Sequence, residues 1–434
     1  MKRVIVIGIG IIVLLVAVYV AFRPARNEGV SQYKIRFLSL AWQEQALATN
    51  RAIVNEWNAR HPDMMVEYVQ GSWNSVYDYL TTGFETGDVP DVFHYESSVI
   101  VDFALRGFLT DLGPFVEPEM KDDILSVAWE SVTRRDGQVS GIPFLMESLI
   151  GLYNKEMLEQ AGIEPPTFQN PWTWSTLRDA ARRLTLKAPA EGAEGRWGVA
   201  IGLRNSANIV MNLSVSFGGS YFTMEGSQYV VRVGPAEREL LSTLYDLLYT
   251  DRSAAPSSIG QSGPSMIPGF IAGRYAMLVG IGAWARQQLI ENARGLRWGV
   301  LPPLKAQSQR TGTSTQTLSI PKASGHQKEA IQFIRFMLNS RNMARLAQSD
   351  WMLPARKSCL AMPEFNSPEN GWDVTTASAR FLSTGPWMGA PGYVEWKSRI
   401  ANPVLQEFFS QRLGLEEAAK RIEQESNVVL SRYQ

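Results

Sequence analysis

The carboxylate of Glu147 lies in the middle of an apolar segment, Gly141 to Asn154, which reads GIPFLMESLIGLYN. A strand this apolar is typical of a sheet that is covered on both faces. A carboxylate inside such a strand is costly unless a partner or water reaches it. We therefore predict that the strand crosses a cleft at Glu147.

The region before this segment predicts alternating strands and helices. Strands are expected at residues 33–40, 65–69 and 91–95, and amphipathic helices at residues 46–60 and 76–86. This order is typical of a parallel sheet covered by helices, in which ligands gather at the carboxyl ends of the strands. That rule selects the side chains that follow the first and third strands: Trp42, Gln43, Glu44, His94 and Glu96.

The second half of the chain offers amide and aromatic side chains beside strand ends and glycines. Asn205 follows a predicted strand at residues 197–202, and Tyr221 follows a Gly-rich turn that has neither the GxxxxGK[ST] nor the GxGxxG phosphate pattern. Trp284 stands just beyond a strand whose closing glycines would let a ligand approach the backbone. Further aromatic candidates, any of which can equally be packing, are Trp351, Trp387 and Tyr393. We expect a loop at residues 254–268 and helices from residue 374 onward.

Composition limits the classes of function. The chain has 434 residues, 45% of them hydrophobic, which is enough for at least two domains. Lys+Arg and Asp+Glu are equal at 42 each, so nothing predicts a nucleic-acid partner. The single Cys and the scattered His residues form no disulfide or metal-binding pattern. No cofactor is predicted.

The N-terminus predicts a membrane segment. Residues 4–22 are uncharged and apolar, with basic residues on both sides. Such a run nearly matches a hydrocarbon core of about 30 Å. It lacks a small-x-small cleavage pattern, and no Cys follows it for lipid attachment. We predict an uncleaved anchor within residues 1–32 that holds the chain on the extracytoplasmic face of the cell membrane. The alternative is a cleaved signal, with the rest of the chain in the periplasm.

Several ordered motifs carry a family resemblance. They are EWNARHP at residues 56–62, GDVPDVF at residues 87–93, YNKEML at residues 153–158, GFIAGRYAMLVGIGAW at residues 269–284 and WMLPAR at residues 351–356. Together with the apolar segment around Glu147 they resemble the family 1 extracellular solute-binding proteins, which are maltose-binding-protein-like sugar receptors of ABC importers. The chain departs from the family's usual pattern in lacking a lipid-attachment Cys and in having Trp351 where a Gly is usual.

The resemblance implies a two-lobed α/β periplasmic-binding-protein fold of type II with discontinuous domains. It places residues 33–143 and 316–360 in lobe 1, and residues 148–312 and 365–434 in lobe 2. The expected hinges lie near residues 144–147, 313–315 and 361–364.

The resemblance also implies a monomeric binding protein, without enzymatic activity, that captures a carbohydrate and presents its closed form to the transmembrane subunits of an ABC permease. Aromatic faces and polar edges are what a sugar site requires. A receptor for an oligopeptide or polyamine and a membrane-anchored sensor remain alternatives. A glycoside hydrolase that uses two of Glu44, Glu96 and Glu147 is another.

Overall fold

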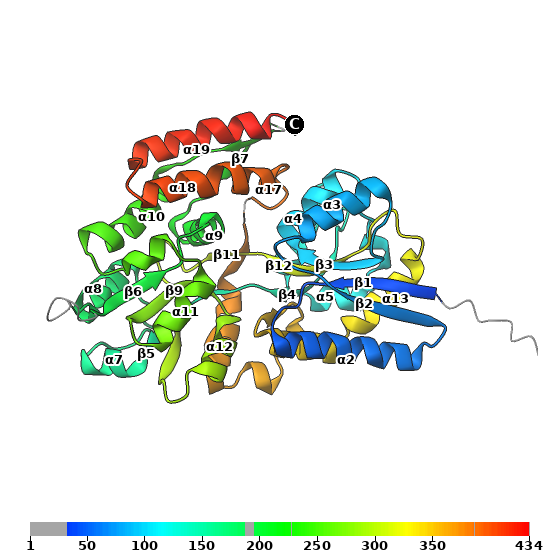
Figure 1. Cartoon of the computed structure of the whole chain (residues 1–434), viewed down its shortest axis with the longest axis horizontal. Coiled ribbons are helices and arrows are strands. Elements are labelled where there is room, and N and C mark those ends of the chain that lie inside the picture. The colour runs from blue at the N-terminus through cyan, green and yellow to red at the C-terminus, as the bar shows by residue number, and fades with distance from the viewer. Residues whose placement is uncertain (1–32, 187–194, 227, 386, 434) are drawn as a thin grey trace, which may run out of the picture.

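The molecule consists of two α/β bodies joined by extended segments. The computed structural model describes residues 33–186, 195–226, 228–385 and 387–433. In Figure 1 the strands that connect the bodies run across the middle of the molecule, where β11 leads into β12 of the sheet on the right. We call the body on the right, which contains β1, lobe 1, and the body on the left, which contains β9, lobe 2.

Lobe 1 is built on a six-stranded sheet with the order β13-β4-β12-β3-β1-β2. Strands β2 and β3 pair in parallel with β1, as the alternating pattern predicts, whereas β12 pairs antiparallel with β3 and β4. The later half of the chain therefore returns to this sheet. The strands are β1 (Tyr33–Ser39), β2 (Met64–Gln70), β3 (Val92–Glu96), β4 (Ile142–Met146), β12 (Thr315–Ser319) and β13 (Leu353–Pro354).

Helices with apolar faces cover this sheet. Trp57 and Leu80, for example, are buried in its core with Phe333 from the second half of the chain. The helices are α2 (Glu44–Arg60), α3 (Val76–Thr86), α4 (Ser97–Leu105), α5 (Pro118–Asp123), α6 (Ser126–Glu130), α13 (Gln327–Met337), α14 (Ser340–Asp350) and α15 (Lys357–Leu360).

Lobe 2 contains a four-stranded sheet with the order β10-β5-β9-β6. All eight residues of β9 are buried, because helices pack on both of its faces. The strands are β5 (Leu149–Asn154), β6 (Trp197–Ile201), β9 (Tyr275–Gly282) and β10 (Trp298–Leu301), and a separate hairpin is formed by β7 (Phe222–Glu225) and β8 (Gln228–Val231). The helices are α7 (Lys155–Gln160), α8 (Trp174–Leu184), α9 (Ala207–Phe217), α10 (Pro235–Tyr245), α11 (Gly263–Ile271), α12 (Ala285–Asn292), α17 (Tyr393–Trp396), α18 (Asn402–Phe409) and α19 (Leu415–Leu430).

The segment around Glu147 is two strands rather than one. Strand β4 ends at Met146 in the lobe 1 sheet, and β5 begins at Leu149 in the lobe 2 sheet. A second crossing breaks in the same way at Ser314, between β11 (Thr311–Thr313) and β12. The two breaks are bonded to each other: the Glu147 N–H donates to the Ser314 carbonyl (3.1 Å), and the Thr313 hydroxyl donates to the Glu147 carbonyl (2.5 Å).

The third connection differs from the prediction. Phe365, Trp372 and Leu382 belong to the lobe 1 core, although residues 365–434 were assigned to lobe 2. A strand, β14 (Leu382–Thr384), pairs in parallel with β11 inside the region predicted to be entirely helical. This region also contains α16 (Trp372–Ser378). The predicted loop at residues 254–268 is likewise wrong at its end, because α11 begins at Gly263.

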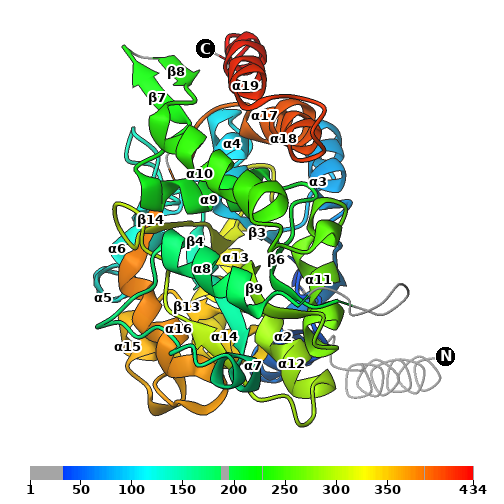
Figure 2. The same ribbon diagram turned by 90° about the vertical axis from the view of Figure 1, so that its left-hand side faces the viewer.

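The lobes also meet at the end of α4. The Gly392 N–H, just before α17, donates to an oxygen of Asp102 on α4 (3.1 Å). Figures 1 and 2 both show α17 beside α4, with α18 and α19 lying over lobe 2. The C-terminal helices therefore belong to lobe 2 and contact lobe 1 near α17.

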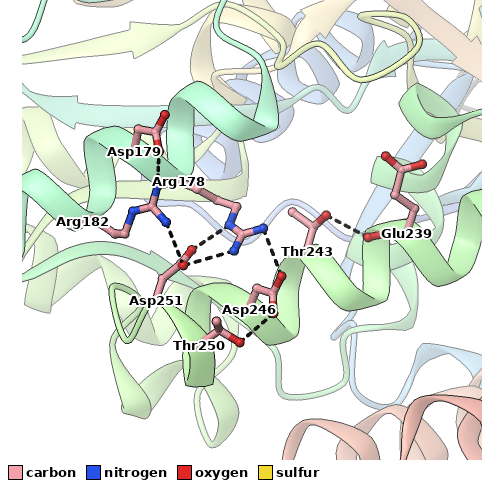
Figure 3. A network of polar contacts seen from close by, with 8 residues as sticks. All are labelled: Arg178, Asp179, Arg182, Glu239, Thr243, Asp246, Thr250 and Asp251. Atoms are coloured by element: carbon pink, nitrogen blue, oxygen red, sulfur yellow. Dashed lines mark hydrogen bonds and ion pairs between the residues drawn. The ribbon is translucent and has the colours of Figure 1, made fainter.

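A set of ion pairs, which we call the α8 clamp, joins α8 to the π-helical segment η2 (Asp246–Thr250) in lobe 2 (Figure 3). Arg178 donates to both oxygens of Asp251 (2.7 and 3.1 Å) and pairs with Asp246 (3.0 Å). Arg182 pairs with Asp251 (3.1 Å) and with Asp179. Burial opposes ionisation of Asp251, but the hydrogen bonds and charges of the two arginines outweigh it and lower its pKa.

The predicted membrane anchor within residues 1–32 lies outside the described residues. Among the residues that the structure does describe, no helix combines the length and the apolar composition that crossing a bilayer would require.

Candidate ligand-binding cleft

A cavity of about 180 Å³ lies between the lobes, where the two hinge strands break. Lobe 1 contributes the end of β3 and the start of α4, and lobe 2 contributes α9, the end of β9 and the segment before α17. The polar and aromatic residues that line it are Glu96, Ser98, Glu147, Asn208, Asn212, Trp284, Ser314, Trp387 and Tyr393.

Glu147 occupies the floor of this cavity beside Trp284. A Cβ atom added to Gly282 would come within 2.1 Å of the Trp284 indole nitrogen and 2.9 Å of a Glu147 carboxylate oxygen. Gly282 therefore allows the indole and the carboxylate to meet over the end of β9. Burial and the negative charge of Glu96 raise the pKa of Glu147, and a hydrogen bond from the Trp284 indole opposes them, with a net pKa of about 7.

Glu96 faces Glu147 from lobe 1. Its carboxylate lies 3.6 Å from the ammonium group of Lys397, which belongs to η7 (Lys397–Ala401) in lobe 2. The Tyr393 hydroxyl donates to Asn208 Oδ1 (2.8 Å), and its ring lies under Lys397, 5.3 Å from the nitrogen. These contacts hold a carboxylate, an ammonium group and a phenol ring at one end of the cavity.

Asn212 lies one helical turn from Asn208 on α9, so both amides face the same side of the helix. Asn212 is 8% exposed, and its Oδ1 is buried with no hydrogen-bond partner among the described residues. A Cβ atom on Gly312 would lie 2.5 Å from the Trp387 ring and 2.6 Å from Asn212 Oδ1, so the glycine allows this close packing.

A second carboxylate lies behind Trp42 and Gln43 in lobe 1. Gln43 Nε2 donates to the Asp350 carboxylate (3.0 Å) and to the Asp350 carbonyl (3.1 Å). Burial raises the pKa of Asp350 to about 6, against the opposing hydrogen bond from Gln43. Trp42 is 47% exposed and packs edge-to-face on Trp284, with 5.4 Å between ring centres. This pair joins an indole of lobe 1 to one of lobe 2 beside the cavity.

Trp351 supports the site from behind and does not line the cavity. It ends α14 in the left-handed conformation (φ 57°), and its ring stacks on Trp372. The buried guanidinium of Arg286 lies 4.1 Å from the centre of the Trp372 ring and donates to the Trp351 carbonyl (3.0 Å). Burial lowers the pKa of Arg286 to about 9. Arg286 thus ties α12 of lobe 2 to the end of α14 in lobe 1.

Four of the predicted site residues lie elsewhere. His94 is buried in the lobe 1 sheet, where Nδ1 accepts from the Leu40 N–H (3.2 Å) and Nε2 therefore donates to Gln316 (2.9 Å). Burial lowers the pKa of His94 to about 4, so the ring is neutral. Tyr221 is 2% exposed in the lobe 2 core, and Glu44 and Asn205 are exposed without lining the cavity. A strand end or a glycine turn places a residue near an edge, but tertiary packing decides which way its side chain points.

The structure brings together five of the predicted residues in the cavity wall: Glu96, Glu147, Trp284, Trp387 and Tyr393. The prediction did not include four polar residues of the wall, Ser98, Asn208, Asn212 and Ser314, nor Lys397, which pairs with Glu96 beside it. For Asn212 a signal was available, because an amide interrupts the apolar sequence of α9, ANIVMNLSVSF.

A larger cavity of about 750 Å³ lies beyond the segment that precedes α17. It is bounded by the turn around Arg135 in lobe 1 and by the β7–β8 hairpin of lobe 2, where Arg135 lies 4.9 Å from the centre of the Tyr229 ring. None of the residues predicted to bind ligand lines it. The smaller cavity is the better candidate site, because both hinge breaks and the buried carboxylate meet there.

Comparison with known proteins agrees with this architecture. The maltose-bound MalE3 of T. maritima superposes with a TM-score of 0.77 at 20% sequence identity, covering 91% of this chain and 99% of that chain. This likeness confirms the two-lobed periplasmic sugar-binding-protein fold that the sequence motifs implied.

Sequence relatives cover most of the chain. A Streptomyces antibioticus protein described as an uncharacterized lipoprotein in the oleD 5′ region is 40% identical over 380 residues, covering 87% of this chain and 82% of that protein. The diacetylchitobiose-binding protein DasA of Streptomyces coelicolor is 22% identical over 382 residues, covering 85% of this chain and 84% of DasA. The model of the bacterial extracellular solute-binding protein family matches residues 41–344. The chain therefore belongs to the bacterial extracellular solute-binding proteins.

Proposed function

We propose that this chain captures a carbohydrate in the cleft between its lobes and presents the closed form to the permease of an ABC importer. The observation that carries the proposal is the composition of the cavity at the hinge. Indole and phenol rings supply faces for the apolar side of a sugar ring, and carboxylates and amides supply edges for its hydroxyl groups. The names of MalE3 and DasA, which refer to maltose and diacetylchitobiose, support the same class of ligand.

The position of the cavity supports closure as the signal. Glu96 and Ser98 come from lobe 1, and Asn212, Trp284 and Trp387 come from lobe 2. A ligand that contacts both sets binds the closed form better than the open form, and its differential affinity shifts the population toward closure. The proposed moving units are residues 33–143 with 316–360 and residues 148–312 with 365–434, although the core packing of Phe365 and Trp372 argues for a third crossing later than residue 364.

We further propose that the apolar run at residues 4–22 keeps this extracytoplasmic protein at the membrane surface and that the protein acts as a monomer. The run has no following Cys, so lipid attachment at that point is excluded even though the similar S. antibioticus protein is described as a lipoprotein. Carbonate extraction of membranes that carry the full chain tests the anchor. Release of the chain into the supernatant would contradict it.

Thermal unfolding of the full chain in mild detergent, measured against mono- and oligosaccharides, tests the ligand class. A carbohydrate at 100 times its dissociation constant adds about 2.7 kcal/mol to the free energy of unfolding. Trp284→Ala removes an aromatic face and should reduce the shift, whereas Tyr79→Ala, an exposed aromatic on α3 away from the cavity, should not. If spermidine or oligopeptides raise the unfolding temperature and no carbohydrate does, the carbohydrate proposal is wrong.

A further inference from the structure

The cavity contains two carboxylates and an amide oxygen that accept hydrogen bonds, beside hydroxyl and amide groups that can also donate. The carboxylates of Glu96 and Glu147 only accept when ionised, and Asn212 Oδ1 is a buried acceptor that has no partner among the described residues. Two nearby donors are already committed, since the Trp284 indole donates to Glu147 and the Tyr393 hydroxyl donates to Asn208. An occupant that brings hydrogen-bond donors is therefore complementary to the two carboxylates and to Asn212 Oδ1.

The charges around the cavity do not cancel. Lys397 lies 3.6 Å from Glu96 and offsets that carboxylate. Glu147 has no ion pair among the described residues, and Asp350, whose charge also acts on Glu147, is bonded to the neutral amide of Gln43. A neutral occupant that displaced water from Glu147 would leave an uncompensated carboxylate in a dry site, which is costly.

Aromatic rings line the same space. Trp284, Trp387 and Tyr393 all contribute to the cavity wall, and Trp387 and Tyr393 are 3% and 2% exposed. A cation beside the face of such a ring is attracted by the ring's quadrupole, and the attraction grows when water is excluded. Lys397 already makes this contact with the ring of Tyr393, 5.3 Å from its centre.

We propose that the carbohydrate captured here carries a protonated amine, as an amino sugar or an amine-bearing glycoside does, and that its ammonium group binds the Glu147 carboxylate on the side open to the cavity, beside the indole of Trp284. This inference depends on the proposed function, because it names the ligand class of the same cleft. An ammonium group supplies donors and no acceptor, and it also supplies the missing positive charge. Sugar hydroxyls would supply hydrogen-bond donors but no positive charge.

A proton balance distinguishes the two kinds of ligand without any mutation. The pKa of Glu147 is about 7 in the protein without ligand, so a fraction of the side chains carries a proton at pH 6.5. An ammonium ligand favours the carboxylate form and should release that proton to the buffer. A neutral sugar should release none, or take protons up. Calorimetry of the same binding reaction in two buffers of different ionisation enthalpy measures the difference.

The central experiment uses matched sugar pairs at pH 6.5 with the full chain in mild detergent. The pairs are glucosamine and glucose, galactosamine and galactose, and chitobiose and cellobiose, each differing in whether an amine replaces a hydroxyl. For at least one pair we expect the amine to bind about tenfold more tightly or better, because hydrogen bonds to charged groups contribute about 1.5–3 kcal/mol. Glu147→Gln keeps the shape of the side chain and removes its charge, and it should abolish this preference.

Glu239→Gln is the matched control, since it makes the same charge change on an exposed position of α10, away from the cavity. If the amine and its hydroxyl counterpart bind with equal affinity in every pair that shows binding, the amine inference is wrong and the carbohydrate proposal stands. If the amine is preferred but Glu147→Gln preserves the preference, the ammonium group does not bind at Glu147. If no sugar of a broad mono- and oligosaccharide panel binds, the proposed function fails and this inference fails with it.

Discussion

The fold gives two of its carboxylates opposite surroundings. One is Asp251 in the α8 clamp of lobe 2, and the other is Glu147 at the hinge, in the cleft. Two arginines surround Asp251 and lower its pKa, whereas Glu147 is left among another carboxylate and an indole and its pKa rises to about 7. Charges that hold helices together are neutralised within the protein. The cleft keeps a charge that the protein itself does not neutralise, which is where a ligand has the most to contribute.

Removing Arg178 from the clamp should have the largest effect on stability. Arg178→Ala leaves Asp251, whose side chain is 3% exposed, with Arg182 as its remaining partner. We expect the free energy of unfolding to fall by about 3 kcal/mol, because the buried carboxylate loses the arginine that binds both of its oxygens and keeps only the half-exposed Arg182. Urea unfolding measures this, and Arg399→Ala, which breaks an exposed pair with Glu395, is the control with an expected effect of about 0.5 kcal/mol.

The same variant has a defined pH dependence. Because the folded-state pKa of Asp251 is lowered, its contribution to stability is present above the unfolded pKa and is lost as the pH falls through the folded pKa. The difference in the free energy of unfolding between the native chain and Arg178→Ala should therefore have its full value at pH 7 and become smaller in acid. A difference that is constant from pH 7 to pH 3 would show that the clamp acts by packing and not by charge.

The stability contribution that Glu147→Gln tests should depend on pH in the opposite direction to that of Asp251. The pKa of Glu147 rises from 4.5 to about 7 on folding, so the stability that its protonated form contributes is complete below pH 4.5 and is lost as the pH rises through about 7. We expect the glutamine variant to match the native chain at pH 4 and to exceed its free energy of unfolding by about 3 kcal/mol at pH 8. Thermal unfolding at the two pH values, without ligand, measures the difference. A variant that is less stable than the native chain at pH 8 would contradict the view that Glu147 is a destabilising charge.

Gly282→Ala should disturb the cleft and spare the clamp. The added methyl group would meet the indole nitrogen of Trp284 and the carboxylate of Glu147, so one of them must move. Overpacking of this kind costs about 1–3 kcal/mol, and displacement of Trp284 should change the tryptophan fluorescence. Gly260→Ala meets no atom within 4 Å and is the control. Unchanged fluorescence in Gly282→Ala would mean that the indole and the carboxylate are not in contact.

Lys397→Gln should have the smallest effect on stability, about 0.5 kcal/mol, because the pair with Glu96 is long and partly exposed. Its informative effect is on Glu147, whose pKa Lys397 lowers. The free energy of unfolding of Lys397→Gln is compared with that of the double mutant Lys397→Gln/Glu147→Gln across pH. The pH at which the difference is half complete should be higher than in the comparison of the native chain with Glu147→Gln. No movement of this pH would show that the two side chains are screened from each other.

Local sequence was enough to predict the segment that passes from one sheet to the other at Glu147 and some of the residues that line the cavity there. The apolar runs on both sides of Glu147 mark a segment buried in two sheets, and the glycines at the end of β9 mark a close approach at Trp284. His94 and Tyr221 were misplaced because their surroundings come from far along the chain: the partner of His94 is Gln316, 222 residues away. Lys397 was missed because its role depends on the meeting of α17 with α4, which no local pattern encodes.

The bond between the two hinge breaks has a mechanical consequence. The Glu147 N–H donates to the Ser314 carbonyl, and the Glu147 carbonyl accepts from the Thr313 hydroxyl. The residue whose carboxylate faces the cleft therefore also lies on the axis about which the lobes would rotate. A contact on the rotation axis exerts almost no torque on the lobes. Contacts at Glu147 can therefore decide which solute stays, whereas the torque that closes the lobes has to come from contacts farther from this bond.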